Sequence, residues 1–291
     1  MKKSETKLRV ACEISSDRVV AAQAGEGLGS IRGCTIRALA PGVLTPTLTA
    51  TNVGDRDALV TAVSDVLDGV GTKERDIIAV IPDAACRIAL LDFDSLPDKS
   101  QDADAVVRFR LKKSLPFDVE RARLSYDVRA NNGNVQVVAV VAVPSIVEEY
   151  ESVLRSAGFS PGVVIPSTLA ALQIVHGSRP TLVLKIASNS VSLAILYEDA
   201  LRLFRTLEGE PANPAQLAED IYPSFVFFED TYGAKIESLI IDGPGTKELA
   251  PAMEESTGIR VHELVDASMA GGTVPGTQRP YVGGILGALI S

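Results

Sequence analysis

Short apolar runs separated by polar turns dominate the first part of the chain and predict an α/β protein. Residues 8–14 and 18–24 are apolar runs on either side of the polar turn 15–17, which is the pattern of a β-hairpin. Residues 57–68 place leucine and valine at helical spacing. Residues 76–81 form a nearly continuous apolar run, as in a strand that is buried on both faces.

A similar order of patterns returns in the second part of the chain. Apolar runs predict strands at 181–186, 191–197 and 201–206, followed by a long helix at 214–232. Pro223 lies inside this helix and is expected to kink or split it. Further predicted elements are strands at 238–241 and 260–264 and helices at 246–257 and 282–290. Two halves that open with strands and close with helices suggest an internal duplication.

A separate module lies between the two halves. A strand at 87–93, a helix at 101–114, a hairpin turning at 131–134 and a helix at 145–157 give the order β-α-β-β-α. This order predicts a small inserted α/β domain. The main fold then resumes with a strand at 163–165, and Ser167 is expected to cap the next helix.

Composition excludes several classes of function. The chain carries a net charge of −9, which argues against binding to the phosphates of nucleic acid. His176 and His262 stand apart and no CxxC motif occurs, so a zinc site is not expected, and the three cysteines are expected to be thiols in a reducing compartment.

Membrane insertion is not expected either. The longest apolar runs, 137–143 and 282–290, are far shorter than the ~20 residues that cross a bilayer. The N-terminus has basic residues without an apolar core behind them, so it is not a signal peptide. We expect a cytoplasmic protein that is peripheral at a membrane only through a partner.

Two hairpins carry the most informative pattern. Segments 9–20 and 182–193 each combine an apolar strand, a charged residue, a short polar turn and a second apolar strand. Actin-like ATPases present their two phosphate-binding hairpins in this way. The chain resembles the PilM family of type IV pilus assembly proteins, which is related to the cell-division protein FtsA. The resemblance rests on these hairpins together with segments 115–128, 150–161, 166–174, 240–245 and 283–289.

The resemblance implies an α/β, actin-like (ribonuclease H-like) fold with two lobes. The first lobe would comprise 1–83, 163–180 and about 280–291, and 84–162 would be an FtsA-type inserted α/β subdomain. The second lobe would be 181–279. It is expected to lack most of its outer subdomain, because only a short linker stands where family members usually place that subdomain.

The resemblance also implies where a nucleotide would lie. In active members the phosphate chain lies between the two hairpin turns, whose backbone N–H groups hold it, and a third loop faces the adenosine. The corresponding residues here are Ser15, Ser16 and Asp17 in the first turn, Ser188, Asn189 and Ser190 in the second, and Gly243 and Gly245 in the third loop. A simple turn without a ligand is the alternative interpretation of each.

The chain departs from the family pattern at both hairpins. Family members have aspartate where Glu13 and Lys185 stand here, and glycine where Ser15 and Ala187 stand. Glycine lets backbone approach a ligand closely, and a lysine cannot hold the water shell of magnesium, although it can contact a phosphate. We therefore expect no metal site, no catalytic residue, and binding of ATP that is weak or lost.

The charge change predicts a contact of its own. Hairpin acids face each other across the cleft in this fold, so Glu13 and Lys185 would be close and of opposite charge. Such a pair could hold the lobes together without metal, although desolvation offsets much of its Coulomb attraction. The alternative is that both side chains reach solvent.

The partner implied by the resemblance is the cytoplasmic N-terminal peptide of a single-pass inner-membrane pilus protein, PilN-like, and through it the assembly motor. Candidate partner-binding residues are Leu115, Phe117, Arg108 and Lys112. The basic run 108–113 could contact acidic segments or anionic lipid, or it could be a solvated helix face, and the two apolar residues could belong to the core. No nucleic acid is expected, and a homo-oligomer stays open because actin-like folds can polymerise.

Three functions remain open, and we favour the first. The protein is a structural adaptor of a pilus assembly platform, or an active actin-like ATPase or sugar kinase, or the cytoplasmic part of a GspL-like type II secretion protein. A kinase needs a catalytic carboxylate, and Glu13 is the only candidate in the hairpins. GspL-like proteins continue into a transmembrane helix, and the sequence given ends at Ser291 without one.

Overall fold

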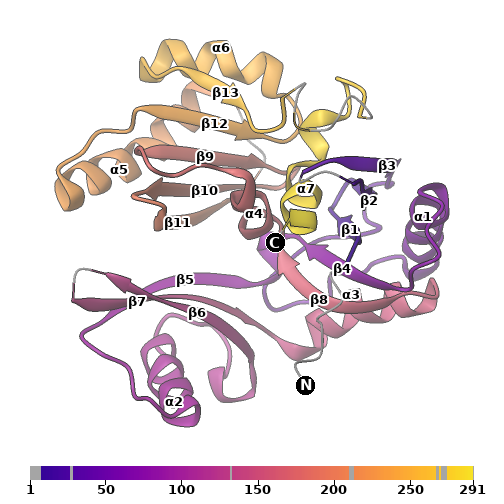
Figure 1. Ribbon diagram of the computed structural model, residues 1–291, viewed down its shortest axis with the longest axis horizontal. Coiled ribbons are helices and arrows are strands. Elements are labelled where there is room, and N and C mark those ends of the chain that lie inside the picture. Colours follow the sequence, from indigo (N-terminus) through magenta and orange to yellow (C-terminus); the bar gives the residue numbers. More distant parts are fainter. Residues whose placement is uncertain are drawn as a thin grey trace.

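Two five-stranded sheets with the same strand arrangement form the two lobes of the protein (Figure 1). The computed structural model describes residues 8–26, 29–131, 133–209, 213–266, 269 and 274–290. The first sheet has the order β3-β2-β1-β4-β8, in which β1, β2 and β3 are antiparallel and β4 and β8 are parallel to β1. Its strands are β1 (Val10–Ile14), β2 (Arg18–Ala24), β3 (Ile31–Ala38), β4 (Asp76–Ile81) and β8 (Ser160–Pro166).

The second sheet repeats this arrangement with the order β11-β10-β9-β12-β13. Here too the first three strands are antiparallel and the last two are parallel to the central β9. The strands are β9 (Thr181–Ile186), β10 (Ser190–Tyr197), β11 (Ala200–Glu208), β12 (Ser238–Asp242) and β13 (Val261–Glu263). The matching topology places Glu13 and Lys185 at the same position, one residue before the end of the central strand of each lobe.

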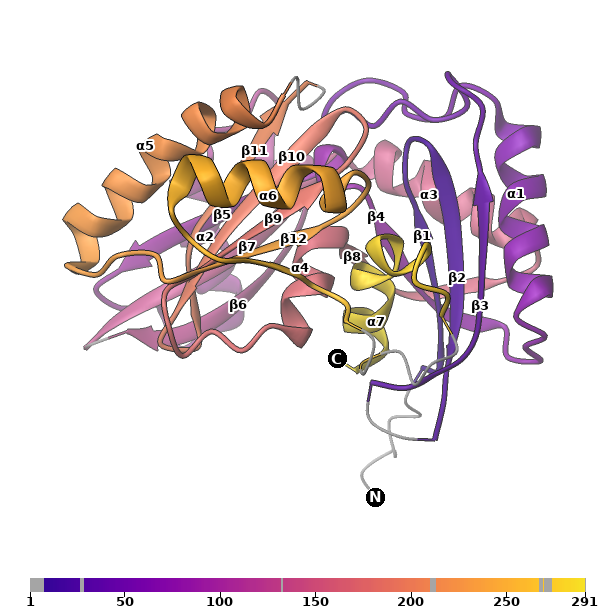
Figure 2. The same cartoon turned by 90° about the horizontal axis from the view of Figure 1, so that it is seen from above.

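Helices α5 (Pro214–Tyr232) and α6 (Thr246–Thr257) cover one face of the second sheet (Figure 2). Leu217, Ile221 and Phe228 of α5 are buried against it. The structure shows one helix through Pro223, so the prediction of a split is wrong. Pro223 is exposed, and the carbonyl that loses its N–H partner there is on the side open to water.

A three-stranded antiparallel sheet forms a third layer with the order β5-β7-β6. Helix α2 (Ser100–Leu111) covers its outer face, where Val107 and Leu111 pack on Val137, Ala139 and Val141. The inner face carries residues that contact the two lobes (Figure 1). The strands are β5 (Arg87–Phe93), β6 (Arg123–Asn131) and β7 (Asn134–Ala142).

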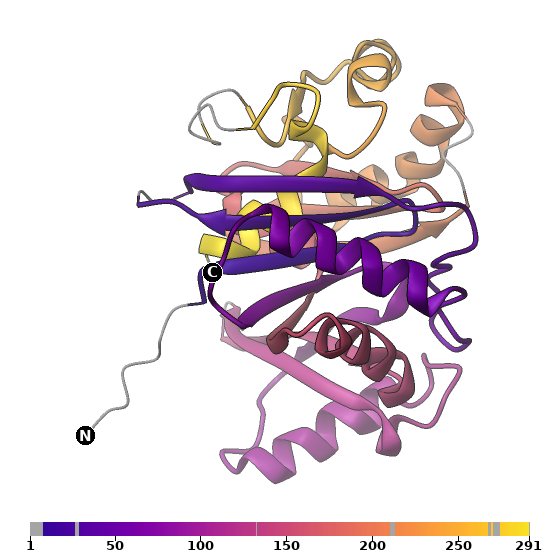
Figure 3. The same ribbon diagram turned by 90° about the vertical axis from the view of Figure 1, so that its right-hand side faces the viewer.

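Helix α3 (Pro144–Ser156) lies elsewhere than the sequence analysis placed it. We expected it in the inserted subdomain, but its apolar face packs beside α1 (Arg56–Gly69) in the core of the first lobe (Figure 3). Tyr150 is fully buried there, and its hydroxyl donates to Asn52 Oδ1 over 2.8 Å. Helical spacing shows that a face is apolar but does not say which sheet the face covers, so the sequence could not assign α3.

Two short helices lie between the lobes: α4 (Ser167–Ala171) and α7 (Gly283–Ile290) (Figure 1). They pack on each other so closely that a Cβ at Gly287 would lie 1.9 Å from the carbonyl oxygen of Ala170. Buried α7 residues such as Ile285 and Leu286 join the core of the first sheet. The 3-10 turns of the fold are η1 (Asp83–Ala85), η2 (Val119–Arg121), η3 (Leu172–Ile174) and η4 (Arg279–Tyr281).

Two further expectations concern membranes and cysteines. None of the helices in the described part of the chain is long and apolar enough to span a bilayer. Cys12, Cys34 and Cys86 are free thiols, of which Cys12 and Cys86 are buried.

Candidate functional site

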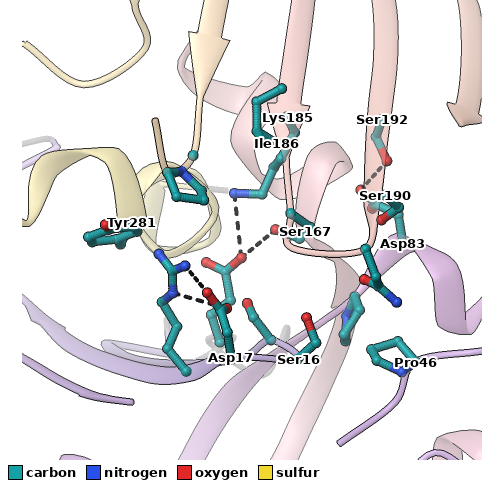
Figure 4. A pocket seen from close by; sticks show the side chains of 18 of the residues that line it. Ser16, Asp17, Pro46, Asp83, Ser167, Lys185, Ile186, Ser190, Ser192 and Tyr281 are labelled. Carbon is teal, nitrogen blue, oxygen red and sulfur yellow. Dashed lines mark hydrogen bonds and ion pairs between the residues drawn. The ribbon is translucent and has the colours of Figure 1, made fainter. Parts of the chain in front are cut away.

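The turns of the β1–β2 and β9–β10 hairpins meet between the two lobes (Figure 4). The hydroxyls of Ser16 and Ser188 are hydrogen-bonded to each other across the cleft. Beside this contact lies a cavity of about 50 Å³. Of the residues predicted for nucleotide contact, the cavity is lined by Ser15, Ser16, Asp17, Asn189, Ser190 and Gly243.

Lys185 joins the two lobes at this cavity. Its Nζ lies 2.7 Å from Asp242 Oδ2 and 3.5 Å from Glu13 Oε1. The side chains of Lys185, Glu13 and Asp242 are 11%, 4% and 1% exposed. We call these three residues the cleft triad.

Asp242 is the member of the triad that the sequence analysis missed. The strand-to-helix turn that contains it was considered only as an adenosine loop. Strands β9 and β12 are parallel neighbours, and Asp242 is paired in register with Lys185. The signal available in the sequence was a pair of apolar strands that both have a charged residue at or next to their last position. One has Lys185 there and the other has Asp242.

The triad keeps Lys185 charged. Burial alone would lower the pKa of Lys185, but the carboxylates of Asp242 and Glu13 outweigh it and raise the pKa above its ordinary value. One ammonium between two carboxylates leaves a formal charge of −1. Glu13 Oε2 and Asp242 Oδ1 are buried without a hydrogen-bond partner in the structure.

The first turn of α7 lies against both carboxylates. A Cβ on Gly283 would lie 2.4 Å from Asp242 Oδ2, and a Cβ on Gly284 would lie 2.7 Å from Glu13 Oε2. Only glycine lets the backbone come this near. Since the N-terminal end of a helix carries partial positive charge, its position offsets part of the excess negative charge of the triad.

Asp83 forms a second contact between the lobes. It follows β4, and its carboxylate accepts hydrogen bonds from Thr168 N at 3.0 Å, Thr168 Oγ1 at 2.5 Å and Ser192 Oγ at 2.7 Å. Ser192 belongs to β10 of the second lobe. Burial raises the pKa of Asp83, and the bonds from Thr168 and Ser192 act in the opposite direction. Asp83 was not among the residues predicted from the sequence.

Ser167 has a different role from the predicted one. Pro166 is at the N-cap position of α4, and no side chain caps the helix. The Ser167 hydroxyl instead donates to Glu13 Oε1. A serine before a helical run predicts a cap, and only the fold shows that the glutamate of β1 lies within reach.

The cavity between the hairpins is much smaller than a nucleotide pocket. Pockets for small molecules are roughly 300–1,000 Å³, whereas the cavity between the hairpins is about 50 Å³, which is room for a water or two. Asp17 is ion-paired with Arg18, whose guanidinium stacks on Tyr281 at 3.8 Å from the ring centroid. The residues present therefore do not fit a nucleoside triphosphate in this conformation.

The two glycines of the predicted adenosine loop have structural roles. Gly243 has a φ of +129°, and a Cβ there would lie 2.2 Å from the carbonyl oxygen of Ile186. Gly245 has a φ of +74° and is at the N-cap position of α6, and it does not line the cavity. Both positions require glycine without reference to a ligand.

Three of the four predicted partner-binding residues serve the fold of the third layer. The side chain of Arg108 is 17% exposed, is ion-paired with Asp104 over 2.8 Å and donates to the backbone carbonyls of Val119 and Ala122. Leu115 and Phe117 are partly buried against the core beneath α2. Lys112 is exposed. The four residues therefore do not form one groove.

A groove lies on the inner face of the third sheet, and of the predicted partner-binding residues Arg108 is among those that line it. Two cavities of about 440 and 460 Å³ share Ser125 and Val140 and run between this sheet and the two lobes. Strands β6 and β8, which contribute residues to both, are edge strands of their sheets. Further lining residues are Val138, Val164, Ile165, Leu169 and Leu172. We call this the β6–β8 groove.

The chain is similar to several solved structures. A chain of the PilM–PilN type IV pilus biogenesis complex matches with a TM-score of 0.81 and 18% identity, covering 98% of this chain and 97% of that one. The cytoplasmic domain of EpsL, an inner-membrane component of the type II secretion system of Vibrio cholerae, matches with a TM-score of 0.52 and 11% identity, covering 81% and 82%.

A third similar structure is the ethanolamine utilization protein EutJ from Carboxydothermus hydrogenoformans, with a TM-score of 0.55 and 8% identity over 97% of this chain and 89% of that one. No family model matches the chain, and no curated protein matches it in sequence. The predicted α/β fold is confirmed. The protein has a two-lobed actin-like fold and is similar over nearly its whole length to a chain of the PilM–PilN complex.

Proposed function

We propose that this protein is a structural adaptor of a type IV pilus assembly platform at the inner membrane, and that it works without a nucleotide cycle. It binds the cytoplasmic tail of a PilN-like membrane protein and links that protein to the assembly motor. The observation that carries the proposal is the contrast between two sites. The cleft between the hairpins is filled by the cleft triad, while the β6–β8 groove is open.

The β6–β8 groove has the features that a peptide tail requires. Edge strands present unpaired backbone N–H and C=O groups, and an extended peptide can pair with them as an added strand. Val140 and Leu169 are among the apolar side chains that would take alternate residues of such a peptide. The combined space is large enough for several side chains, in contrast to the cleft.

Similarity to the PilM–PilN complex supports the choice of partner. That structure is a pilus biogenesis complex, and its match covers almost all of this chain. The cytoplasmic domain of EpsL supports a second candidate, a platform of type II secretion, with a lower TM-score. Peptides from the two kinds of membrane protein distinguish the candidates.

The proposal is tested by fluorescence anisotropy of the full chain with a labelled synthetic peptide. The peptide is the cytoplasmic N-terminal tail of the PilN-like protein from the same organism. We expect saturable binding that falls at least tenfold in Ser125→Arg, because Ser125 is exposed and lines both parts of the groove. Ser256→Arg, at an exposed position on α6, is the matched control and should bind like the wild type.

Two results would overturn the proposal. One is the absence of binding to this tail by the folded wild-type protein at high micromolar concentration. The other is binding that Ser125→Arg leaves unchanged, which would place the peptide elsewhere. Binding of the secretion-system tail in preference to the pilus tail would select the second candidate.

A further inference from the structure

The C-terminal end of α2 combines an exposed aromatic side chain with basic residues. Phe109 is 77% exposed, the most exposed of the large apolar side chains in the described part of the chain. Arg110, Lys112 and Lys113 surround it in sequence and are all exposed. We call these four residues the α2 tip.

Helical geometry points Phe109 away from the third sheet. Val107 and Leu111 are fully buried against the third sheet. Phe109 lies midway between them in sequence, so at 100° per residue it points to the opposite side of the helix. Arg110 is the next residue of the helix, and Lys112 and Lys113 follow directly after its last residue, Leu111. The aromatic ring is therefore on the exposed side of the helix, with three exposed basic residues next to it in the chain.

The charge of this surface is opposite to that of the molecule. No acidic residue occurs from 105 to 117, whereas the chain as a whole carries a net charge of −9. The ion pairs found among the described residues do not include Arg110, Lys112 or Lys113. Arg108 differs from them, because its guanidinium is bound to Asp104 and to two backbone carbonyls. The three exposed cations are thus available to a partner.

The position of the α2 tip makes it accessible to a flat surface. Helix α2 covers the face of the third sheet that points away from both lobes, and it is the outermost layer of the molecule (Figure 3). A helix C-terminus favours nearby cations through its dipole, which accounts for basic residues there. It does not account for an exposed phenylalanine next to them.

We propose that the α2 tip binds an anionic lipid surface. Phe109 enters the interface between headgroups and acyl chains, and the three cations contact lipid phosphates. Each basic residue near an anionic bilayer strengthens binding about fivefold. The tip by itself gives a reversible contact, since stable anchoring takes a second signal. The inference is independent of the tail-binding function proposed above, although both would hold the protein at the same membrane.

The test is co-sedimentation of the full chain with vesicles at low salt. We expect binding to phosphatidylglycerol vesicles, little binding to phosphatidylcholine vesicles, and loss of binding as salt increases. Lys112→Gln removes one positive charge and should weaken the partition coefficient about fivefold, which corresponds to about 1 kcal/mol per charge. Phe109→Ser should weaken it by roughly tenfold or more, because the apolar area no longer leaves water.

The control is an exposed aromatic residue in acidic surroundings. Phe227 on α5 is 52% exposed and lies close in sequence to Glu229 and Asp230. Phe227→Ser should leave vesicle binding unchanged, and all three variants should keep the circular dichroism of the wild type. The proposal is overturned if phosphatidylglycerol vesicles do not bind the wild type at low salt, if both lipids bind equally, or if Phe227→Ser weakens binding as much as Phe109→Ser. Capture of acidic peptides without vesicle binding would assign the tip to a protein partner and would also overturn it.

Discussion

At Lys185 a single ammonium group lies between two buried carboxylates, one from each lobe. The Coulomb attraction of such a group is partly cancelled by the loss of hydration of all three charges, so its net contribution to stability can be small. Removing one member has a larger effect, because the charges left behind stay buried and lose their partner.

We therefore expect Lys185→Met to destabilise the protein by about 3–5 kcal/mol. The measurement is the free energy of unfolding from urea titrations at neutral pH. Lys235→Met is the matched control, because the Lys235 side chain is 81% exposed and its ion pair with Glu229 is 3.5 Å long. That variant should change the free energy of unfolding by less than about 1 kcal/mol.

A combined variant separates loss of the lysine from loss of the charges. Glu13→Gln, Lys185→Met and Asp242→Asn together remove all three charges and keep similar volumes. The combined variant should regain most of the stability lost in Lys185→Met. If Lys185→Met alone were as stable as wild type, the triad would not couple the lobes.

Asp83 gives a pH dependence whose sign follows from its burial. Because burial raises its pKa in the folded state, the native protein holds this proton more tightly than the unfolded chain does. The contribution of Asp83 is therefore most favourable at low pH and declines as pH rises from about 4, the unfolded value, through the folded pKa. The side chain introduced by Asp83→Asn does not titrate. The free energy of unfolding of this variant minus that of the wild type should therefore increase over that pH range.

The measurement is a set of urea titrations across pH. Asp98→Asn, at an exposed position, controls for the loss of one negative charge. Curves for Asp83→Asn and wild type that run parallel across the range, or that diverge in the opposite direction, would refute the assignment.

At the scale of elements, α7 can pack closely between the two lobes because half of its residues are glycine or alanine. Its glycines let the helix contact Glu13, Asp242 and α4 at distances that a Cβ would obstruct. The sequence showed a small-residue helix here but not its neighbours, since nothing local in 283–290 indicates the two carboxylates.

Gly287→Ala should be strongly destabilising. A Cβ there would lie 1.9 Å from the carbonyl oxygen of Ala170, which is backbone and cannot rotate away. Overpacking of this kind costs about 1–3 kcal/mol or more, measured as a lower midpoint in thermal unfolding. Gly276→Ala is the control, because a Cβ at Gly276 meets no atom within 4 Å. Equal midpoints for the two variants would show that α4 and α7 can separate at little cost.

The elements themselves were largely predictable, and their partners were not. Both hairpins, the buried strand at 76–81 and the helix at 246–257 follow from apolar periodicity and turn residues, which are local properties. Asp242 and Ser167 join the site through register and packing between segments that are distant in sequence. A sequence shows that a strand ends with a charged residue. Which side chain that residue contacts depends on the completed fold.

At the scale of the whole molecule, two lobes of one topology meet at a cleft that is closed by their own side chains. The Ser16–Ser188 contact, the cleft triad and the bonds of Asp83 each join one lobe to the other. These contacts lie between the two hairpin turns, where the resemblance described under Sequence analysis implied a phosphate chain.

Titration with Mg-ATP tests the closed cleft directly. We expect no heat of binding up to millimolar ATP in isothermal calorimetry, because opening the cleft would break the ion pair of Lys185 with Glu13 and the hydrogen bond of Ser192 to Asp83. Circular dichroism of the same sample shows that the protein is folded. Binding with micromolar affinity would mean that the lobes open readily and would return the active ATPase to consideration.

The lysine between the lobes also bears on how the protein would behave during pilus assembly. Unlike a bound nucleotide or metal ion, a cation that is covalently part of the chain cannot be exchanged for another ligand. On the proposed function, the protein would behave as a fixed strut whose shape is the same through every round of pilus extension and retraction. The step that consumes energy and sets the rate of assembly would then take place in other subunits, and this protein would only transmit their movement.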